Sequence, residues 1–120
     1  MAPAAPILVV EDEAMIRMMV LEILEDEGYR VISARDADEA GHLLDAHPDI
    51  TLLFTDVDMP GTIDGLALAS RVHSTRPEIE IVVTSGRHQI ADSALPDNGD
   101  FIPKPYTTQQ LLDVVEKKLT

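Results

Sequence analysis

The chain alternates short runs of apolar, mostly β-branched residues with longer stretches in which apolar residues recur at helical spacing. The short runs are typical of strands buried on both faces of a sheet, and the longer stretches predict helices that cover them. Strands are expected at Ile7 to Val10, Tyr29 to Ser33, Ile50 to Thr55, Ile79 to Thr84 and Asp100 to Ile102. Five strands that alternate with helices indicate an α/β domain with a parallel sheet.

Helix start and stop signals fall between these strands. Helices are expected at Ala14 to Glu27, from the N-cap Asp36 to about Ala46, at Gly65 to Thr75, and from the N-cap Thr107 to Leu119. A further stretch, His88 to about Leu95, has room only for a short helix because Pro96 and Asn98-Gly99 follow it. Right-handed crossovers leave few topologies, and the flavodoxin-like one fits this length best. The predicted fold is a doubly wound (βα)5 parallel sheet with strand order 2-1-3-4-5 and a shortened fourth helix.

Composition limits the classes of function. The 120 residues are enough for one domain, placed at residues 1–120 with Met1 to Pro6 as a loose tail. The chain has no cysteine, which excludes disulfides, zinc–thiolate sites and thiol catalysis. Its formal net charge of −13 repels nucleic acid phosphates, so no direct binding to DNA or RNA is expected. The sequence contains no recognisable signal peptide or membrane span, so a cytoplasmic location without membrane attachment is expected.

Polar residues follow the predicted strands at their carboxyl ends, where sheets of this type bind ligands. These residues are Glu11, Asp12 and Glu13 after the first strand, Asp56 and Asp58 after the third, Thr84, Ser85 and Gly86 at the end of the fourth, and Lys104 after the fifth. In the order 2-1-3-4-5 the first and third strands are neighbours. We therefore expect Glu11, Asp12 and Asp56 to meet in one cleft, with Thr84 and Lys104 on its far side.

This set of side chains suits phosphoryl transfer. Carboxylates that share a cleft repel one another, and a divalent cation relieves the repulsion. Hard oxygen ligands favour Mg²⁺ or Mn²⁺ over Zn²⁺. Asp56 can then act as a nucleophile and form an aspartyl-phosphate. The cation and Lys104 would neutralise charge on the phosphoryl oxygens, and the Thr84 hydroxyl would donate a hydrogen bond to one of them.

Five motifs in order carry a resemblance to a known family. They are LVVEDE at residues 8–13, LLFTDVDMPG at residues 52–61, DG at residues 64–65, IVVTSG at residues 81–86 and FIPKPY at residues 101–106. Each lies at a predicted strand end or just after it, and together they span nearly the whole chain. The sequence thus resembles the receiver domains of two-component response regulators. The chain ends with its last predicted helix, so it is expected to be either a stand-alone receiver or a fragment of a longer regulator or hybrid kinase. The initiator-like Met1 and the short tail favour a stand-alone or N-terminal receiver.

The resemblance implies a role for each residue at the acidic cleft. Asp56 would be the phosphoacceptor. Mg²⁺ or Mn²⁺ would be held by Glu11, Asp12, Asp56 and the main-chain carbonyl of Asp58.

It also implies the residues that sense the phosphate. Thr84 would be the switch hydroxyl, Lys104 the lysine beside the phosphate, and Phe101 the switch aromatic. The Lys104-Pro105 peptide bond would be cis, an isomer that costs little before proline.

The implied function is that of a signalling phosphoprotein in a phosphorelay. A sensor histidine kinase or a histidine phosphotransfer protein would pass a phosphoryl group to Asp56. The face formed by the fourth helix, the fifth strand and the last helix would then change its affinity for a downstream protein target. No enzymatic activity beyond self-catalysed phosphotransfer and slow autodephosphorylation is expected. Because the fourth helix is short, a monomer or a weak dimer is expected.

Two alternatives remain. The pair Asp56 and Asp58, followed by Gly61-Thr62, is similar to the nucleophile motif of haloacid-dehalogenase-like phosphohydrolases, although Met59-Pro60 intervene. A pseudo-receiver that only binds proteins is the other, but such a chain would lack Asp56 or Lys104. Among the remaining residues, the methionines of the first helix are expected to fill the core. The four histidines have no metal-ligand spacing: His42, His47, His73 and His88.

Overall fold

Five parallel strands form one sheet in the order β2-β1-β3-β4-β5, which confirms the predicted topology. The computed structural model describes residues 5–61, 63–87, 89–96 and 99–120. The strands are β1 (Ile7–Val10), β2 (Val31–Ala34), β3 (Leu52–Asp56), β4 (Glu80–Ser85) and β5 (Gly99–Pro103). The α-helices are α1 (Ala14–Asp26), α2 (Ala37–Ala46), α3 (Gly65–Thr75) and α4 (Thr108–Leu119).

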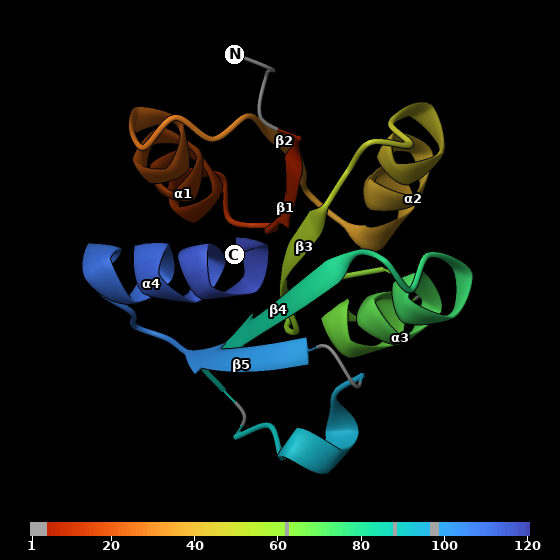
Figure 1. Ribbon diagram of the computed structural model, residues 1–120. Coiled ribbons are helices and arrows are strands. Elements are labelled where there is room, and N and C mark those ends of the chain that lie inside the picture. The colour runs from red at the N-terminus through yellow and green to blue at the C-terminus, as the bar shows by residue number, and fades with distance from the viewer. Residues whose placement is uncertain (1–4, 62, 88, 97–98) are drawn as a thin grey trace.

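The helices cover the two faces of the sheet in pairs (Figure 1). On one face, Val20 and Leu24 of α1 and Leu111 and Val115 of α4 are buried against alternate strand residues such as Phe54. On the other face, α2 and α3 pack against the strand residues of the opposite parity. Members of that second core include Leu8, Val10, Ala40, Leu53, Leu68 and Val72. Side chains in a strand alternate between faces, so this arrangement also decides which polar residues share a side.

Helix ends are where the sequence signals place them. The Asp36 side chain accepts a hydrogen bond of 2.8 Å from the Glu39 backbone N–H, as an N-cap does. Thr107 and Gln110 form a reciprocal capping box at the start of α4. Both caps were predicted, and α3 has the predicted bounds.

Among its described residues, the connection between β4 and β5 holds a single 3₁₀ turn, η1 (Asp92–Ala94), in place of an α-helix. The prediction of a shortened helix is therefore confirmed, but the five helices expected are reduced to four α-helices in the described part of the chain. A segment closed by Pro96 has too few residues for a stable α-helix of several turns. His88 and Asn98, named in that prediction, lie outside the described residues.

The methionines of α1 do not fill the core, and that prediction was wrong. Met15, Met18 and Met19 are 86%, 66% and 48% exposed, whereas the buried residues of α1 are Val20 and Leu24. The helix is apolar on two sides, and helical spacing alone does not say which side faces the sheet. An exposed apolar strip of this kind requires a functional explanation.

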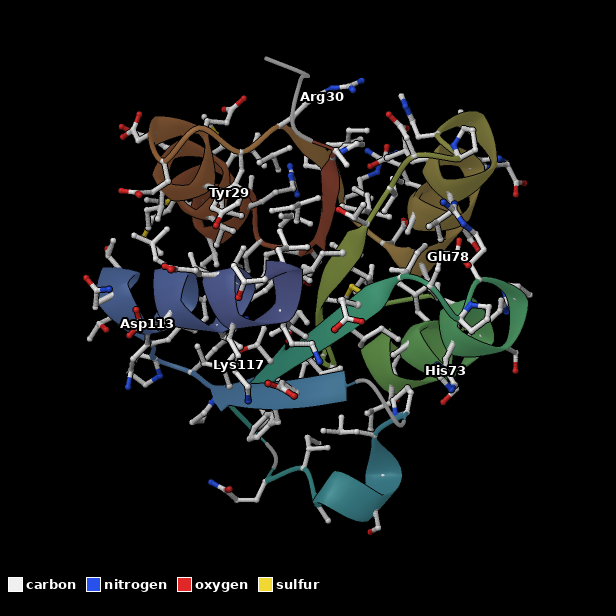
Figure 2. The ribbon with its side chains drawn as sticks, viewed as in Figure 1. Tyr29, Arg30, His73, Glu78, Asp113 and Lys117 are labelled. Atoms are coloured by element: carbon white, nitrogen blue, oxygen red, sulfur yellow. The ribbon has the colours of Figure 1, made fainter. Side chains whose placement is uncertain are left out.

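Ion pairs connect α4 to the neighbouring strands. Figure 2 labels Lys117 on α4, beside β5, where its Nζ lies 3.0 Å from the Asp100 carboxylate. Lys118 Nζ lies 3.4 Å from Asp100 and 3.5 Å from Glu80 of β4. Burial tends to raise the pKa of Asp100, but its hydrogen bond to Lys117 and the nearby Lys118 outweigh this and lower it.

None of the described helices is long and apolar enough to cross a bilayer.

Candidate functional site

The strand register brings the predicted polar residues to one edge of the sheet. Asp56, the last residue of β3, pairs in register with Thr84 of β4. Glu11 follows β1 directly, and Lys104 follows β5 directly. Asp56 and Thr84 continue the strand positions of Phe54 and Val82, so their side chains share the sheet face covered by α1 and α4.

Lys104 connects two buried carboxylates that come from different strands. Its Nζ lies 2.8 Å from Glu11 Oε1 and 3.1 Å from Asp56 Oδ2. Glu11 and Asp56 are each 3% exposed. Charge-assisted hydrogen bonds of this length at buried sites fix the orientation of all three groups. The ammonium is therefore held against the Asp56 carboxylate on one side of the cleft.

Burial changes the protonation of the charged groups around Asp56. It raises the pKa of Glu11 to about 7, although the hydrogen bond from Lys104 opposes the shift. Burial also tends to lower the pKa of Lys104, but hydrogen bonds to Glu11 and Asp56 outweigh it and raise that pKa. The lysine thus stays charged, whereas Glu11 is only partly ionised near neutral pH. A single ammonium does not compensate the acidic group, and a bound cation would.

The acidic group has the composition and openness that a hard cation needs. Oxygen atoms of Glu11, Asp12 and Asp56 all lie within 4.8 Å of one another. Asp12 is exposed, and the group borders a cavity of about 270 Å³ that Gly86, Arg87 and Lys104 also line. Carboxylate oxygens with room left for water and phosphate oxygens suit Mg²⁺. The residues therefore fit the expected cation.

Thr84 has a hydroxyl that is not satisfied within the fold. Its Oγ1 is buried and finds no hydrogen-bond partner among the described residues. Leaving such a group unpaired costs about 1–3 kcal/mol. A hydroxyl with unused hydrogen-bonding capacity beside Asp56 is what a ligand oxygen in the cleft would satisfy.

Asp58 contacts Asp56 through its backbone N–H, and its side chain is held by Ser85. The sequence did not predict this role for Ser85. The Asp58 backbone N–H donates a 3.1 Å hydrogen bond to Asp56 Oδ1. Its carboxylate accepts a 2.8 Å hydrogen bond from the hydroxyl of Ser85, a buried residue at the end of β4. The sequence placed Ser85 at a strand end, but the partner of its hydroxyl depends on how two loops meet.

Two further predictions concern the FIPKPY motif. The Lys104-Pro105 peptide bond is cis, in agreement with the expectation. Phe101 is half-buried and packs on a small cluster formed by Val57, Ala69, Ile81 and Val83. It lies next to β4, in register with Val83.

Gly65 sets the distance between α3 and the end of β3. A Cβ added at Gly65 would overlap the carbonyl oxygen of Asp56 and lie 2.6 Å from its carbonyl carbon and 2.9 Å from the Cα of Val57. Only glycine allows the first turn of α3 to approach so closely. The start of α3 therefore lies directly against the backbone of Asp56.

Comparison with known proteins identifies the family. Residues 7–116 match the family model of the response regulator receiver domain. The chain is 38% identical over 121 residues to the nitrogen assimilation regulatory protein NtrX of Azorhizobium caulinodans, covering 97% of this chain and 26% of that protein. It is 32% identical over 116 residues to the response regulator receiver protein CpdR of Brucella abortus, covering 94% and 95% of the two chains.

A solved structure agrees in sequence and in fold. The crystal structure of the receiver domain of NtrX from Brucella abortus is 39% identical with a TM-score of 0.86, and the match covers 94% of this chain and 97% of that one. The chain spans 26% of NtrX and 54% of the regulatory protein PdtaR of Mycobacterium tuberculosis, both curated relatives. With the acidic cleft, the register and these similarities in agreement, the chain belongs to the response regulator receiver domain family.

Proposed function

We propose that the chain is a phosphate-accepting switch in which Asp56 takes a phosphoryl group from a phosphohistidine. The observation that carries the proposal is the position of Lys104, whose Nζ contacts both the Asp56 and the Glu11 carboxylates. Two further carboxylates beside Asp56 and an unsatisfied hydroxyl on Thr84 complete the groups that phosphoryl transfer needs.

The reaction is a displacement at phosphorus. A carboxylate oxygen of Asp56 forms the new O–P bond as the N–P bond to the donor imidazole breaks, and the imidazole nitrogen takes up a proton. When bound, Mg²⁺ or Mn²⁺ supplies Lewis-acid stabilisation of the phosphoryl oxygens, with Glu11, Asp12, Asp56 and the main-chain carbonyl of Asp58 as its ligands. Lys104 neutralises charge on the same oxygens. Water later attacks the acyl phosphate and regenerates the Asp56 carboxylate.

Thr84 and Phe101 report the state of Asp56. The Thr84 hydroxyl gains a hydrogen-bond acceptor when a phosphoryl oxygen arrives, so the end of β4 is drawn toward Asp56. Phe101 lies on the neighbouring strand against Val83 and Ile81, and it follows the rearrangement. The surface formed by η1, β5 and α4 then changes its affinity for a downstream protein.

The phosphodonor is a histidine kinase or a histidine phosphotransfer protein. Support comes from the exposed strip of Met15, Met18 and Met19, which meets a largely apolar pocket of about 400 Å³. That pocket is lined by Ile16, Met19, Gly86, Lys104, Pro105 and Tyr106. Because the pocket reaches Lys104, a protein bound there brings its histidine toward Asp56. The sensor kinase CckA of Brucella abortus, which is 32% identical over 120 residues, is among the relatives.

Net charge and the short β4–β5 connection are the basis for our proposals on the output partner and the oligomeric state. A net charge of −13 argues against direct binding to nucleic acid, so the output is expected to be a protein contact in the cytoplasm. The residues in the described segments that would form the usual fourth helix make one 3₁₀ turn instead, which favours a monomer or a weak dimer.

Incubation with acetyl phosphate and Mg²⁺ tests the proposal. Intact-mass measurement should show one added phosphate per chain, and none when a chelator removes the cation. Asp56→Asn should accept no phosphate, whereas Asp58→Asn should still accept one. If Asp56→Asn is phosphorylated like the wild type, the assignment is wrong. If Asp58→Asn instead abolishes repeated turnover of a small phosphoester, the phosphohydrolase alternative is correct.

A further inference from the structure

Ser85 forms a bridge between the two loops that border the acidic cleft. Its side chain is 1% exposed. The hydroxyl donates a 2.8 Å hydrogen bond to Asp58 Oδ2 and accepts one of 3.2 Å from the Arg87 backbone N–H. The loop after β3 and the loop after β4 are thus joined through one buried oxygen. A buried hydroxyl that both donates and accepts has a fixed orientation.

The Asp58 carboxylate lies near the cation group but does not belong to it. Asp58 follows Asp56 by two residues and lines the same cavity as Asp12 and Asp56. The described carboxylates whose oxygens lie within 4.8 Å of one another are nevertheless those of Glu11, Asp12 and Asp56. The hydrogen bond from Ser85 holds Oδ2 of the Asp58 carboxylate at the end of β4.

We propose that Ser85 is a positioning residue that keeps the Asp58 carboxylate out of the ligand shell of the cation. With Ser85 in place, Asp58 gives the site its backbone N–H, which contacts Asp56 Oδ1, and not its charge. The inference rests on the proposed function, because it concerns the cation that assists phosphorylation of Asp56.

Charge balance explains why this position matters. A dication, three ionised carboxylates and the Lys104 ammonium sum to zero formal charge. A fourth carboxylate on the cation would leave the site negative before the phosphoryl group, itself an anion, arrives. Like charges at such distances repel strongly where solvent is excluded. The carboxylate would also occupy a coordination position that a phosphoryl oxygen needs. An extra ligand therefore tightens cation binding and slows phosphorylation.

Removal of the hydroxyl tests the inference through cation affinity, measured by calorimetry on the unphosphorylated protein with Mg²⁺ and Mn²⁺. Ser85→Ala should bind Mg²⁺ about tenfold more tightly than the wild type, equivalent to about 1.4 kcal/mol. Ser85→Thr retains a hydroxyl at a strand position and should bind like the wild type. The double variant Ser85→Ala with Asp58→Asn should lose the gain, because the amide carries no charge.

A second readout follows the chemistry. Ser85→Ala should be phosphorylated several-fold more slowly by acetyl phosphate at saturating Mg²⁺, despite its higher affinity for the cation. Ser85→Cys, which has nearly the same shape, gives the same comparison if the melting temperature of Ser85→Ala is depressed.

The outcomes separate the inference from the proposed function. If the wild type binds Mg²⁺ and both Ser85→Ala and Ser85→Cys bind it equally, Ser85 does not control the Asp58 carboxylate and the inference is wrong. A gain in affinity that persists in the double variant also contradicts it, because the Asp58 charge is then not the cause. Failure of the wild type to bind Mg²⁺ at millimolar concentration contradicts the cation assignment in the proposed function, and the inference with it.

Discussion

Glu11 has a carboxyl group that burial keeps protonated well above its ordinary range. Burial raises its pKa from 4.5 to about 7, so the folded protein without a cation binds a proton that the unfolded chain releases. Between these two pH values the folded state holds more protons than the unfolded state. The free energy of unfolding therefore falls as pH rises through this window, and the stabilisation is fully present only below it.

Glu11→Gln separates this contribution from all others. The amide has the same shape, and its oxygen can still accept the hydrogen bond from Lys104 Nζ. Urea unfolding at a series of pH values without divalent cations should show the wild type losing stability relative to Glu11→Gln from about pH 5 to about pH 7. Mg²⁺ should restore the wild type and have little effect on the variant. Parallel stability curves for the two proteins would contradict this account.

Tyr106 has a buried hydroxyl that makes no hydrogen bond to the described residues. Its ring packs edge-on against Phe54 at a centroid distance of 5.9 Å, and its Oη finds no partner among the described residues. Burial raises the pKa of Tyr106 to about 12, so the hydroxyl stays neutral.

Tyr106→Phe should therefore stabilise the protein by about 1 kcal/mol, because it keeps the ring contact and removes an unpaired polar atom. Denaturant unfolding measures the change. The chain has two tyrosines, and Tyr29→Phe is the matched control, expected to change stability by less than about 0.5 kcal/mol. A loss of stability in Tyr106→Phe larger than in the control would show that the hydroxyl is satisfied after all.

At the scale of elements, the position of Asp56 depends on how closely α3 approaches β3. The first residue of α3 is Gly65, and it leaves no room for a Cβ beside the Asp56 carbonyl. Asp64 caps the same helix by accepting a 2.9 Å hydrogen bond from the Ala67 backbone N–H. Asp56 is thus held in place by the start of a helix as well as by its own strand.

Gly65→Ala should destabilise the fold by about 1–3 kcal/mol, since the obstructing atoms are backbone and cannot rotate away. It should also reduce phosphorylation by displacing Asp56. Gly41→Ala is the control within α2, where an added Cβ meets nothing within 4 Å. That variant should be more stable than the wild type by about 0.5–1 kcal/mol, because alanine favours the helix. Equal stability of the two variants, measured by thermal unfolding, would contradict the steric account.

The same elements show what the sequence could predict. Strand order, helix caps and the identity of the strand-end acids follow from local patterns and from the few allowed topologies. The exposure of Met15, Met18 and Met19 could not be predicted, because α1 is apolar on two sides and only tertiary packing chooses between them. The hydrogen bond between Ser85 and Asp58 could not be predicted for a similar reason, because the two residues are 27 positions apart in the chain.

In the molecule as a whole, the acidic cleft lies on a receiver domain whose connection between β4 and β5 has no α-helix among its described residues. Its described residues include one 3₁₀ turn, η1, and its residues Ile90 and Leu95 pack on the same buried cluster as the half-buried Phe101. Ion pairs from Lys117 and Lys118 tie α4 to β5 on the adjoining surface.

We expect a monomer or a weak dimer both with and without beryllofluoride, which mimics the phosphoryl group. Multi-angle light scattering over a range of protein concentrations measures the mass in each state. Asp56→Asn with beryllofluoride is the control, because it should not respond to the ligand. A tight dimer in both states would contradict the expectation.

Under the proposed function, the protein carries phosphate as an acyl phosphate on Asp56. Borohydride reduces an aspartyl-phosphate to homoserine, so treatment of the phosphorylated protein followed by peptide mass spectrometry locates the modified residue. We expect homoserine at position 56, and no homoserine at any position when the chelator is present during phosphorylation. Homoserine at Asp12 or Asp58, or a phosphate that borohydride leaves in place, would contradict it.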